Sequence, residues 1–158
     1  MAPTLRPAEP EDAATVESIV QAAYNHYVAR IGQKPGPMLD DYPALIAANR
    51  VQLLQEGTDT IGVLVLIPEP DAMLLDNVAL HPNAQGRGLG RLLVNAAEQA
   101  ARSAGYTTIR LYTHVMMTEN IALYTRLGYR ETHRAEERGL QRVYMAKPLS
   151  QTLSGTTP

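Results

Sequence analysis

The stretch from Leu74 to Arg91 constrains the fold of this chain more than any other. An apolar run from Met73 to Leu80 predicts a buried strand. Three alternate glycines follow it closely: Gly86, Gly88 and Gly90. A helical pattern begins directly after them. Glycines at such a turn let the backbone adopt positive φ and approach a ligand closely. Because the first amides of a helix are exposed and lie at the positive end of its dipole, this segment predicts an anion-binding loop.

Arg87 and Arg91 stand beside these amides, so the predicted ligand is a phosphate-bearing cofactor. The spacing argues against two common nucleotide motifs. The chain contains no Gly-Lys-Ser or Gly-Lys-Thr, which a P-loop requires. The dinucleotide fingerprint needs a third glycine at the position of Arg91, and it belongs to an early βαβ unit, whereas this loop lies past the middle of the chain.

The loop fits a different signature, in which Gln or Arg is followed after two residues by Gly and, one residue further, by Gly or Ala. Gln85, Gly88 and Gly90 occupy those positions. Together with the preceding segment 78–82 and the downstream segment 120–129, this loop makes the chain resemble the GNAT (GCN5-related) N-acetyltransferases. The resemblance is strong over 73–147, weaker at 5–12 and nearly absent over 30–49.

The resemblance implies an α/β fold with a twisted mixed sheet, whose central strands splay apart, flanked by helices. It also implies acetyl-CoA as the cofactor. In the family the loop holds the diphosphate, and the backbone of the preceding strand holds the pantetheine and acetyl groups. The residues that it assigns to cofactor binding are Val78, Ala79, Leu80, Gln85, Gly86, Arg87, Gly88, Leu89, Gly90, Arg91, Asn120 and Tyr124.

Tyr124 matches the tyrosine that serves as general acid in many members of the family. A phenol with a pKa of about 10 can give a proton to a departing thiolate. Because the chain has no cysteine, a cysteine acyl intermediate is excluded, which agrees with direct attack by an amine. From the residues alone, Tyr124 also reads as a core residue of a short amphipathic helix, and Asn120 as a helix-start residue that caps the backbone.

The general base is less evident. The position of the glutamate base found in the histone-acetylating branch is occupied by Leu74. Asp76, two residues before Val78, can take the amine proton directly or through water; the alternative is that Asp76 and its neighbour Asn77 only satisfy backbone groups. Glu119 is a second carboxylate candidate, with a helix N-terminal charge as its alternative.

Acceptor recognition is expected from 24–42, the segment least like the family, because loops on a rigid scaffold commonly set specificity. The candidate substrate residues are Tyr24, Tyr27 and Asp41. Acidic Asp40 and Asp41 suit an amine, and Arg30 suits a carboxylate. The alternative for the two aspartates is that they cap a helix.

Length and composition agree with a single domain over 1–149, followed by a polar tail at 150–158 that is expected to be disordered. The net charge is only −2, no apolar run approaches the roughly 20 residues of a membrane span, and no hydrophobic signal sequence opens the chain. We therefore expect a cytoplasmic protein with no nucleic-acid or membrane partner. The four histidines show no metal-ligand spacing, so no metal site is predicted.

The remaining patterns predict the element order βααβββαβαββ. Predicted strands are 4–7, 51–55, 60–67, 73–80, 107–113, 129–133 and 142–147, and predicted helices are 10–29, 42–49, 89–104 and 118–127. Thr118 is expected to cap the last helix, and the charged run at 134–138 is expected to be a solvated loop.

The leading interpretation is thus an acetyl-CoA-dependent N-acetyltransferase that acts on a small-molecule amine or a protein amino group. Two alternatives stay open: a non-catalytic module that binds or senses acyl-CoA, and an enzyme that transfers a longer acyl group. Homodimerisation through the two closing strands is a further expectation that the sequence alone does not establish.

Overall fold

The structure is a computed structural model that describes residues 2–150. The tail predicted at 150–158 lies outside the described residues, apart from Ser150.

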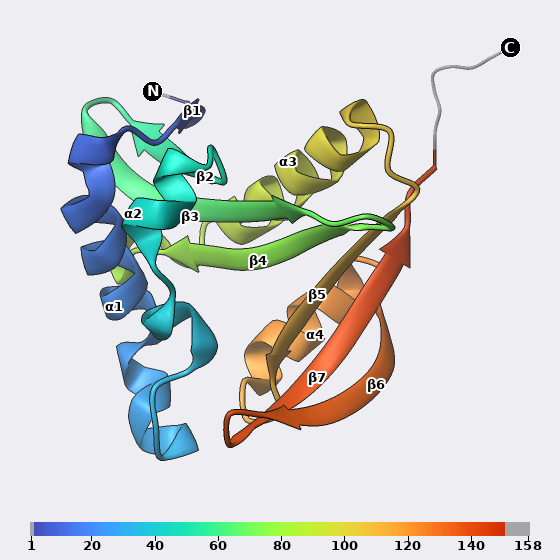
Figure 1. Cartoon of the computed structure of the whole chain (residues 1–158). Helices are drawn as coiled ribbons and strands as arrows, with labels where there is room; N and C mark the ends of the chain where they lie inside the picture. The colour runs from blue at the N-terminus through green and yellow to red at the C-terminus, as the bar shows by residue number, and fades with distance from the viewer. Residues whose placement is uncertain (1, 151–158) are drawn as a thin grey trace, which may run out of the picture. The chain divides into compact units, whose positions relative to one another are not determined.

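The described residues form a seven-stranded mixed sheet with helices against it, in the strand order β1-β2-β3-β4-β5-β7-β6 (Figure 1). Its strands are β1 (Thr4–Pro7), β2 (Val51–Glu56), β3 (Asp59–Pro68), β4 (Met73–Leu80), β5 (Thr108–His114), β6 (Arg130–Glu137) and β7 (Leu140–Pro148). The β4–β5 pair is parallel and joins Met73–Leu75 to Ile109–Leu111, while β4 continues beyond this register to Leu80. The pairs β1–β2, β2–β3, β5–β7 and β6–β7 are antiparallel.

Backbone contacts divide the chain into two compact units. Among the described residues, the first unit comprises 2–66 together with 76–93, and the second comprises 67–75 together with 94–150. The strands β3 and β4 and the helix α3 (Leu89–Ser103) run from one unit into the other. The single domain that the length indicates stays a prediction.

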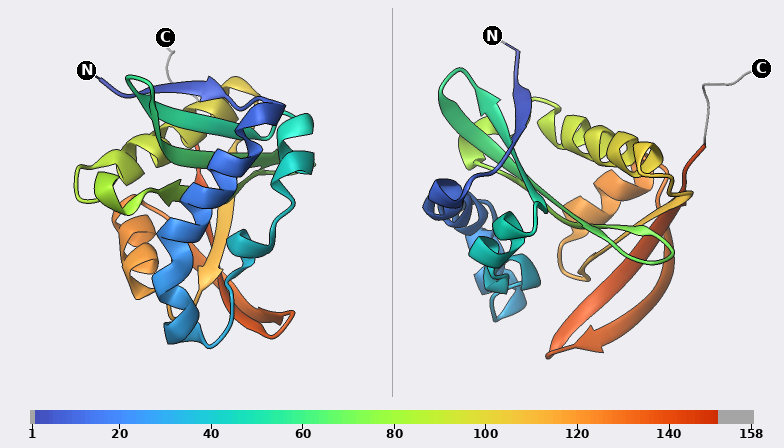
Figure 2. Two further views of the ribbon diagram at one scale, coloured as in Figure 1. Left: turned by 90° about the vertical axis from the view of Figure 1, so that its left-hand side faces the viewer. Right: turned by 45° about the horizontal axis from the view of Figure 1, so that its top comes forward.

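The first unit contains β1, β2, most of β3 and two helices, α1 (Ala13–Ile31) and α2 (Tyr42–Ala47). Short 3-10 turns, η1 (Pro10–Asp12) and η2 (Gly36–Leu39), precede the two helices. The helices pack side by side, as Figure 2 shows. The buried residues of α1 recur at helical spacing: Val16, Ile19, Val20, Ala23, Tyr24 and Tyr27. The strands of this unit add buried residues that include Leu53, Leu54, Val63 and Val65. Gly32 ends α1 at φ +89°, a left-handed conformation that glycine adopts without steric cost.

The second unit contains the rest of α3, the strands β5, β6 and β7, and the helix α4 (Thr118–Arg126), which lies behind β5 and β7 in Figure 1. Its core is formed by alternate residues of β5 and β7 and by one face of α3: Val94, Ala97, Ala101, Ile109, Leu111, Val143 and Met145. This face of α3 also buries a carboxylate residue, Glu98, whereas Ala104, just beyond the end of the helix, is exposed.

Two local predictions are wrong. Most of the charged run expected to be a loop extends β6, and residues 134–137 pair with β7. This strand lies at the edge of the sheet, where charged side chains are favoured because they discourage pairing with other chains. Thr118 is the first residue of α4 and not its cap; the N-cap is Met117, which makes no side-chain capping bond.

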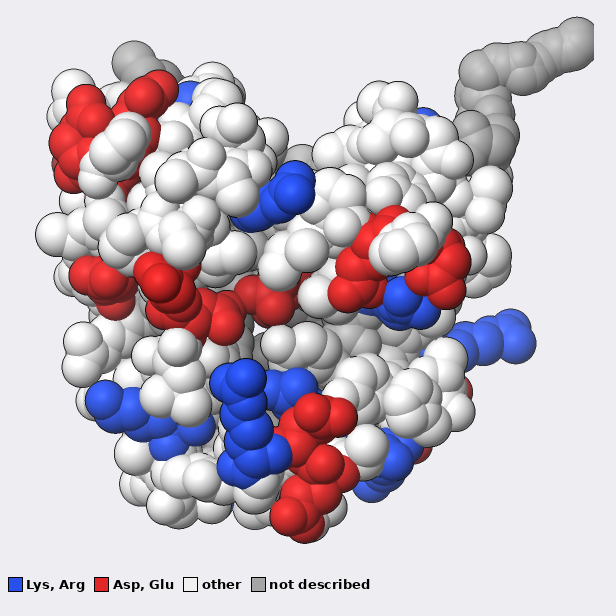
Figure 3. Space-filling model, viewed as in Figure 1, with Lys and Arg blue, Asp and Glu red and all other residues white. Residues whose placement is uncertain are grey.

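Charged side chains of both signs are interspersed over the face seen in Figure 3, as expected for a chain with a net charge of −2. Among the described residues, no helix combines the length and the apolarity needed to cross a bilayer.

Candidate functional site

The glycine loop lies in the first unit, between the short turn η3 (Pro82–Ala84) and the start of α3 at Leu89. Gly86 and Gly88 have φ values of +80° and +78°, which side-chain-bearing residues rarely adopt. A Cβ atom added to either glycine would meet nothing within 4 Å. These two positions therefore need glycine for the backbone conformation, and the space beside their α-carbons is open to a ligand.

The loop presents a run of amides that make no internal hydrogen bond. Within the described part of the chain, no group accepts a hydrogen bond from the backbone N–H groups of residues 86–91. The first amide to donate is that of Leu92, whose nitrogen is 3.2 Å from the Gly88 carbonyl oxygen. Successive amides at a helix start, with glycine on either side, form an anion site. This arrangement fits the diphosphate of a coenzyme.

Arg87 is already engaged in an ion pair. Its Nη1 donates to Oε1 of Glu56 at 3.1 Å, and its Nη2 contacts Oε2 of the same carboxylate at the end of β2. The hydrogen bonds between the two side chains lower the pKa of Glu56 and raise the pKa of Arg87. Both groups are solvent-exposed, so the pair is weak and a stronger anion can compete for the guanidinium.

The end of β4 is tied to this loop. The Gln85 side chain donates from Nε2 to the Leu80 carbonyl oxygen at 3.2 Å, and the next amide, that of His81, donates to the carbonyl oxygen of Ile61 at 2.9 Å. A Cβ added to Gly62 of β3 would lie 3.0 Å from Cδ2 of Leu80 and 3.3 Å from the carbonyl oxygen of Ala79. Glycine at position 62 therefore lets β3 run close to the segment of β4 predicted to hold the pantetheine.

Hydroxyl and amide groups connect α1 and the α2 region to β4. The Tyr24 hydroxyl is 2.7 Å from Oδ1 of Asn77 and 3.0 Å from the carbonyl oxygen of Val78. The Asn77 amide nitrogen donates to the Tyr42 hydroxyl at 2.9 Å, and that hydroxyl donates to the Pro37 carbonyl oxygen. The side chain of Asn77 thus makes hydrogen bonds with two tyrosine hydroxyls. The alternative in which Asn77 satisfies only backbone groups is therefore wrong. Sequence reasoning missed this link because the two tyrosines are distant in sequence.

The other two candidate substrate residues have different environments. Tyr27 is buried on α1, with the Arg30 guanidinium carbon 5.0 Å from its ring centroid. Asp41 is the N-cap of α2, and its Oδ1 accepts a hydrogen bond from the Ala44 amide at 3.1 Å. The capping alternative for Asp41 is therefore confirmed, and its role toward a substrate stays a prediction.

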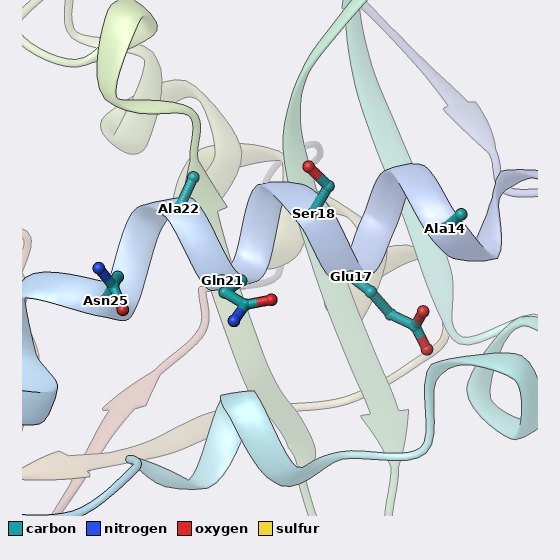
Figure 4. A pocket seen from close by; sticks show the side chains of 6 residues that line it. All are labelled: Ala14, Glu17, Ser18, Gln21, Ala22 and Asn25. Carbon is teal, nitrogen blue, oxygen red and sulfur yellow. The ribbon is translucent and has the colours of Figure 1, made fainter.

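Two hollows lie along α1. One is an open depression lined by side chains of α1 alone, seen in Figure 4: Ala14, Glu17, Ser18, Gln21, Ala22 and Asn25. The other has a volume of about 240 Å³ and is shared with the segment that leads into α2. Its lining residues are Glu17, Val20, Gln21, Lys34, Met38, Asp40 and Tyr42. Four of these residues, from Lys34 to Tyr42, belong to the segment expected to recognise the acceptor, and the lining carries two carboxylates against one ammonium group.

Tyr124 and Asn120 lie in the second unit, on α4. Tyr124 is buried, and its ring meets that of Tyr129 edge-on, with the centroids 5.8 Å apart. Asn120 is half-buried, and its Nδ2 lies 3.7 Å from the sulfur of Met117. The side-chain contact that the structure gives Asn120 is thus to a sulfur atom and not to the helix backbone.

The carboxylate candidates also differ. Asp76 is only 8% exposed, on β4, whereas Glu119 is exposed in the first turn of α4. The candidate residues of the first unit are Tyr24, Tyr27, Asp41, Asp76, Val78, Ala79, Leu80 and 85–91, and those of the second unit are Asn120 and Tyr124. Sequence reasoning missed Glu98, a buried carboxylate near α4. The sequence signal that could have found it is an acidic residue, Glu98, that lies between two alanines, Ala97 and Ala101, on the apolar side of a helix; both alanines are buried.

Comparison with known proteins adds a family match. A family model described as the Acetyltransferase (GNAT) family matches residues 16–129. Among curated proteins, a mycothiol acetyltransferase of Nocardia farcinica is 43% identical over 56 residues, which cover 35% of this chain and 18% of that relative. The match therefore spans less than a fifth of the length of this relative.

Among solved structures, the PaiA N-acetyltransferase of Thermoplasma acidophilum, in complex with coenzyme A, aligns with a TM-score of 0.75 at 18% identity, covering 94% of this chain and 99% of that one. YncA of Salmonella typhimurium, a putative acetyltransferase with acetyl-CoA, aligns with a TM-score of 0.74 at 21% identity over the whole of both chains. These likenesses confirm the fold class predicted from the sequence.

Proposed function

Because this chain belongs to the acetyltransferase (GNAT) family, we propose that it is an acetyl-CoA-dependent N-acetyltransferase acting on an amine of a small molecule or a protein. One observation carries the proposal: the amides of residues 86–91 make no hydrogen bond to the described chain, and they precede α3 beside two glycines at positive φ. Successive backbone amides that make no hydrogen bond within a protein usually donate to a ligand or to water.

Acetyl-CoA supplies the activated acetyl group as a thioester. The loop amides hold its diphosphate, with Arg91 adding positive charge and Arg87 exchanging its exposed carboxylate partner for the phosphate. The main-chain groups of Val78, Ala79 and Leu80 bind the pantetheine and acetyl portion. Gln85 holds the end of this strand in place through its bond to the Leu80 carbonyl oxygen.

Tyr124 is the proposed general acid, which gives its phenolic proton to the sulfur that leaves, and Asn120 contacts the cofactor from the same helix. A large part of the rate enhancement comes from holding the amine and the thioester together, so no covalent enzyme intermediate is needed. The absence of cysteine from the chain agrees with this direct transfer.

Asp76 is the proposed base, which accepts the amine proton directly or through a water molecule. Its place on β4 supports this role, because Asp76 is two residues before Val78, in the strand proposed to hold the acetyl group, and is only 8% exposed. Leu74 cannot serve, since it has no titratable group.

The acceptor is proposed to bind in the first unit, through Tyr24, Tyr27 and Asp41. The hollow between α1 and the α2 region supports a cationic acceptor, because the carboxylates of Glu17 and Asp40 outnumber the single ammonium group of its lining. A cytoplasmic location and a homodimer stay predictions.

A second candidate function is a non-catalytic module that binds or senses acyl-CoA. It is favoured by the presence of Leu74 at the position of the family's glutamate base. In this case the glycine loop keeps its binding role and Tyr124 is only a packing residue.

The test follows free thiol released from acetyl-CoA in the presence of spermidine, single L-amino acids, or peptides with a free N-terminus. We expect release with at least one of these amines and a fall of about 10²- to 10⁴-fold in kcat for Tyr124→Phe, the range that general acids supply. Binding of acetyl-CoA without thiol release on any amine would favour the non-catalytic module. Release from a longer acyl thioester in preference to acetyl-CoA would change the acyl group and not the class of reaction.

A further inference from the structure

The second unit contains a buried carboxylate, Glu98, whose partners lie at the end of α4. Glu98 of α3 is only 4% exposed, and its Oε2 accepts a hydrogen bond from the Tyr129 hydroxyl at 2.9 Å. The Lys147 ammonium of β7 donates to both carboxylate oxygens, at 3.0 and 3.2 Å, and Arg102 lies 3.8 Å from Oε1. Because a buried charge is costly unless it is paired and hydrogen-bonded, these partners hold one another in fixed positions.

Lys147 also fixes the end of α4. Its ammonium donates a further hydrogen bond to the carbonyl oxygen of Leu127, the C-cap residue of that helix, at 2.8 Å. A cation there satisfies an end carbonyl group and interacts favourably with the helix dipole. Gly128 follows at φ +99°, and a Cβ at that position would lie 3.3 Å from Cε of Lys147. The chain therefore turns tightly around the lysine side chain as it leaves α4.

The same turn places Tyr129 against Tyr124. The Tyr129 amide donates to the Tyr124 carbonyl oxygen at 3.0 Å, and the two rings meet at 63°. Edge-to-face aromatic pairs prefer defined geometries. Tyr129 is only 1% exposed, so its ring has little freedom to move while Glu98 holds its hydroxyl.

We propose that Glu98, Lys147 and Tyr129 are positioning residues for Tyr124. Glu98 holds the Tyr129 ring against the Tyr124 ring, and Lys147 holds the end of the helix that carries Tyr124. This inference rests on the proposed function, in which Tyr124 is the general acid. It explains why a carboxylate stands on the buried face of α3, where an apolar residue would otherwise pack.

Burial raises the pKa of Tyr129, and the adjacent Glu98 carboxylate raises it further. Tyr129 therefore keeps its proton and remains a hydrogen-bond donor to Glu98 across the working pH range. The two tyrosines of this pair thus have separate tasks: Tyr129 keeps its proton for Glu98, and Tyr124 is the proton donor of the reaction.

The experiment compares Glu98→Gln and Tyr129→Phe with the wild type, each alone and combined with Tyr124→Phe. Rates are measured as thiol release from acetyl-CoA with the amine that gives the wild type its highest rate among spermidine, L-amino acids and N-terminal peptides. Each single variant should lower kcat about 10- to 100-fold, since a small misplacement of a reacting group can cost that much. The KM for acetyl-CoA should change less than about twofold, because the diphosphate-binding loop is intact. Glu69→Gln is the control: it removes an ion pair to Arg110 in the same unit and should leave kcat unchanged.

In the Tyr124→Phe background, Glu98→Gln and Tyr129→Phe should have no further effect on kcat, because they act through the missing hydroxyl. A second readout needs no acceptor: in protein labelled with ¹³C at the tyrosine ζ-carbon, Tyr129→Phe should shift or broaden the Tyr124 signal, whereas Glu69→Gln should not. If Glu98→Gln fails to fold, Tyr129→Phe decides alone, since it removes one oxygen and keeps the ring.

Effects that multiply with that of Tyr124→Phe, or an unchanged kcat and an unchanged Tyr124 signal in both variants, would overturn the proposal. If Tyr124→Phe itself turns over like the wild type, the general acid of the proposed function fails, and the positioning role fails with it. The two failures are distinguishable, because Tyr124→Phe stays fully active only when the general-acid assignment itself is wrong.

Discussion

Replacing Gly88 with alanine separates the two tasks of the glycine loop. The residue has a φ of +78°, and a Cβ there meets no atom within 4 Å, so the substitution strains the backbone without a clash inside the protein. The left-handed conformation costs an alanine roughly 1–2 kcal/mol. The reduced freedom of the unfolded chain offsets about 0.4–1 kcal/mol of that. The net loss of stability is therefore about 1 kcal/mol, or about 2–4 °C in Tm for a chain of this size.

The effect on acetyl-CoA should be much larger than the effect on stability. The new methyl group occupies the space in which a phosphate would approach the amides. Loss of one hydrogen bond to a charged group corresponds to about 1.5–3 kcal/mol. The Kd for acetyl-CoA should accordingly rise about 10- to 150-fold.

Gly105→Ala is the matched control, because Gly105 has a φ of +89°, an equally open surrounding and a position outside the loop. The assay is isothermal titration calorimetry with acetyl-CoA, together with thermal melting of the free proteins. Both variants should lose similar stability, and only Gly88→Ala should lose affinity. Equal Kd values for the two variants would refute the assignment of the loop as the diphosphate site.

Three further outcomes are expected. Glu56→Gln should tighten acetyl-CoA binding about two- to fivefold, because it removes the exposed partner with which a phosphate competes for Arg87; weaker binding in a titration would show that Glu56 holds Arg87 in its working position. Burial lowers the pKa of His114, so the unfolded chain binds more protons below about pH 6.5 and stability falls as the pH drops; His114→Asn should flatten this part of the Tm profile between pH 7.5 and 5, and an unchanged slope would contradict it. Tyr24→Phe should lower the free energy of unfolding by about 1–3 kcal/mol, since it leaves a buried oxygen of Asn77 without its donor; a loss below about 0.5 kcal/mol in urea denaturation would count against this bond.

The sequence predicts most strongly where local pattern and local chemistry agree. The β4 strand begins and ends at the predicted residues 73 and 80, because the apolar run occupies these positions and is followed by Pro82 and the glycine loop. The left-handed glycines at 86 and 88 follow from the same local argument.

Prediction fails where the outcome depends on contacts between distant segments. The extent of β6 was missed because an edge strand exposed on both faces lacks apolar alternation; only its pairing with β7 defines it. The burial of Glu98 depends on which face of α3 meets the sheet, and on a lysine 49 positions later. The bond between Asn77 and Tyr24 joins residues 53 positions apart, so no local signal announces it.

The central claim is that the amides of residues 86–91 bind the diphosphate of acetyl-CoA. The most direct measurement is a ¹H–¹⁵N NMR titration of the assigned protein with acetyl-CoA. We predict that the amide signals of Gly86, Gly88 and Gly90 shift the most, in proportion to one another and with a single Kd. Binding that leaves these three signals in place while other amides shift would contradict the account.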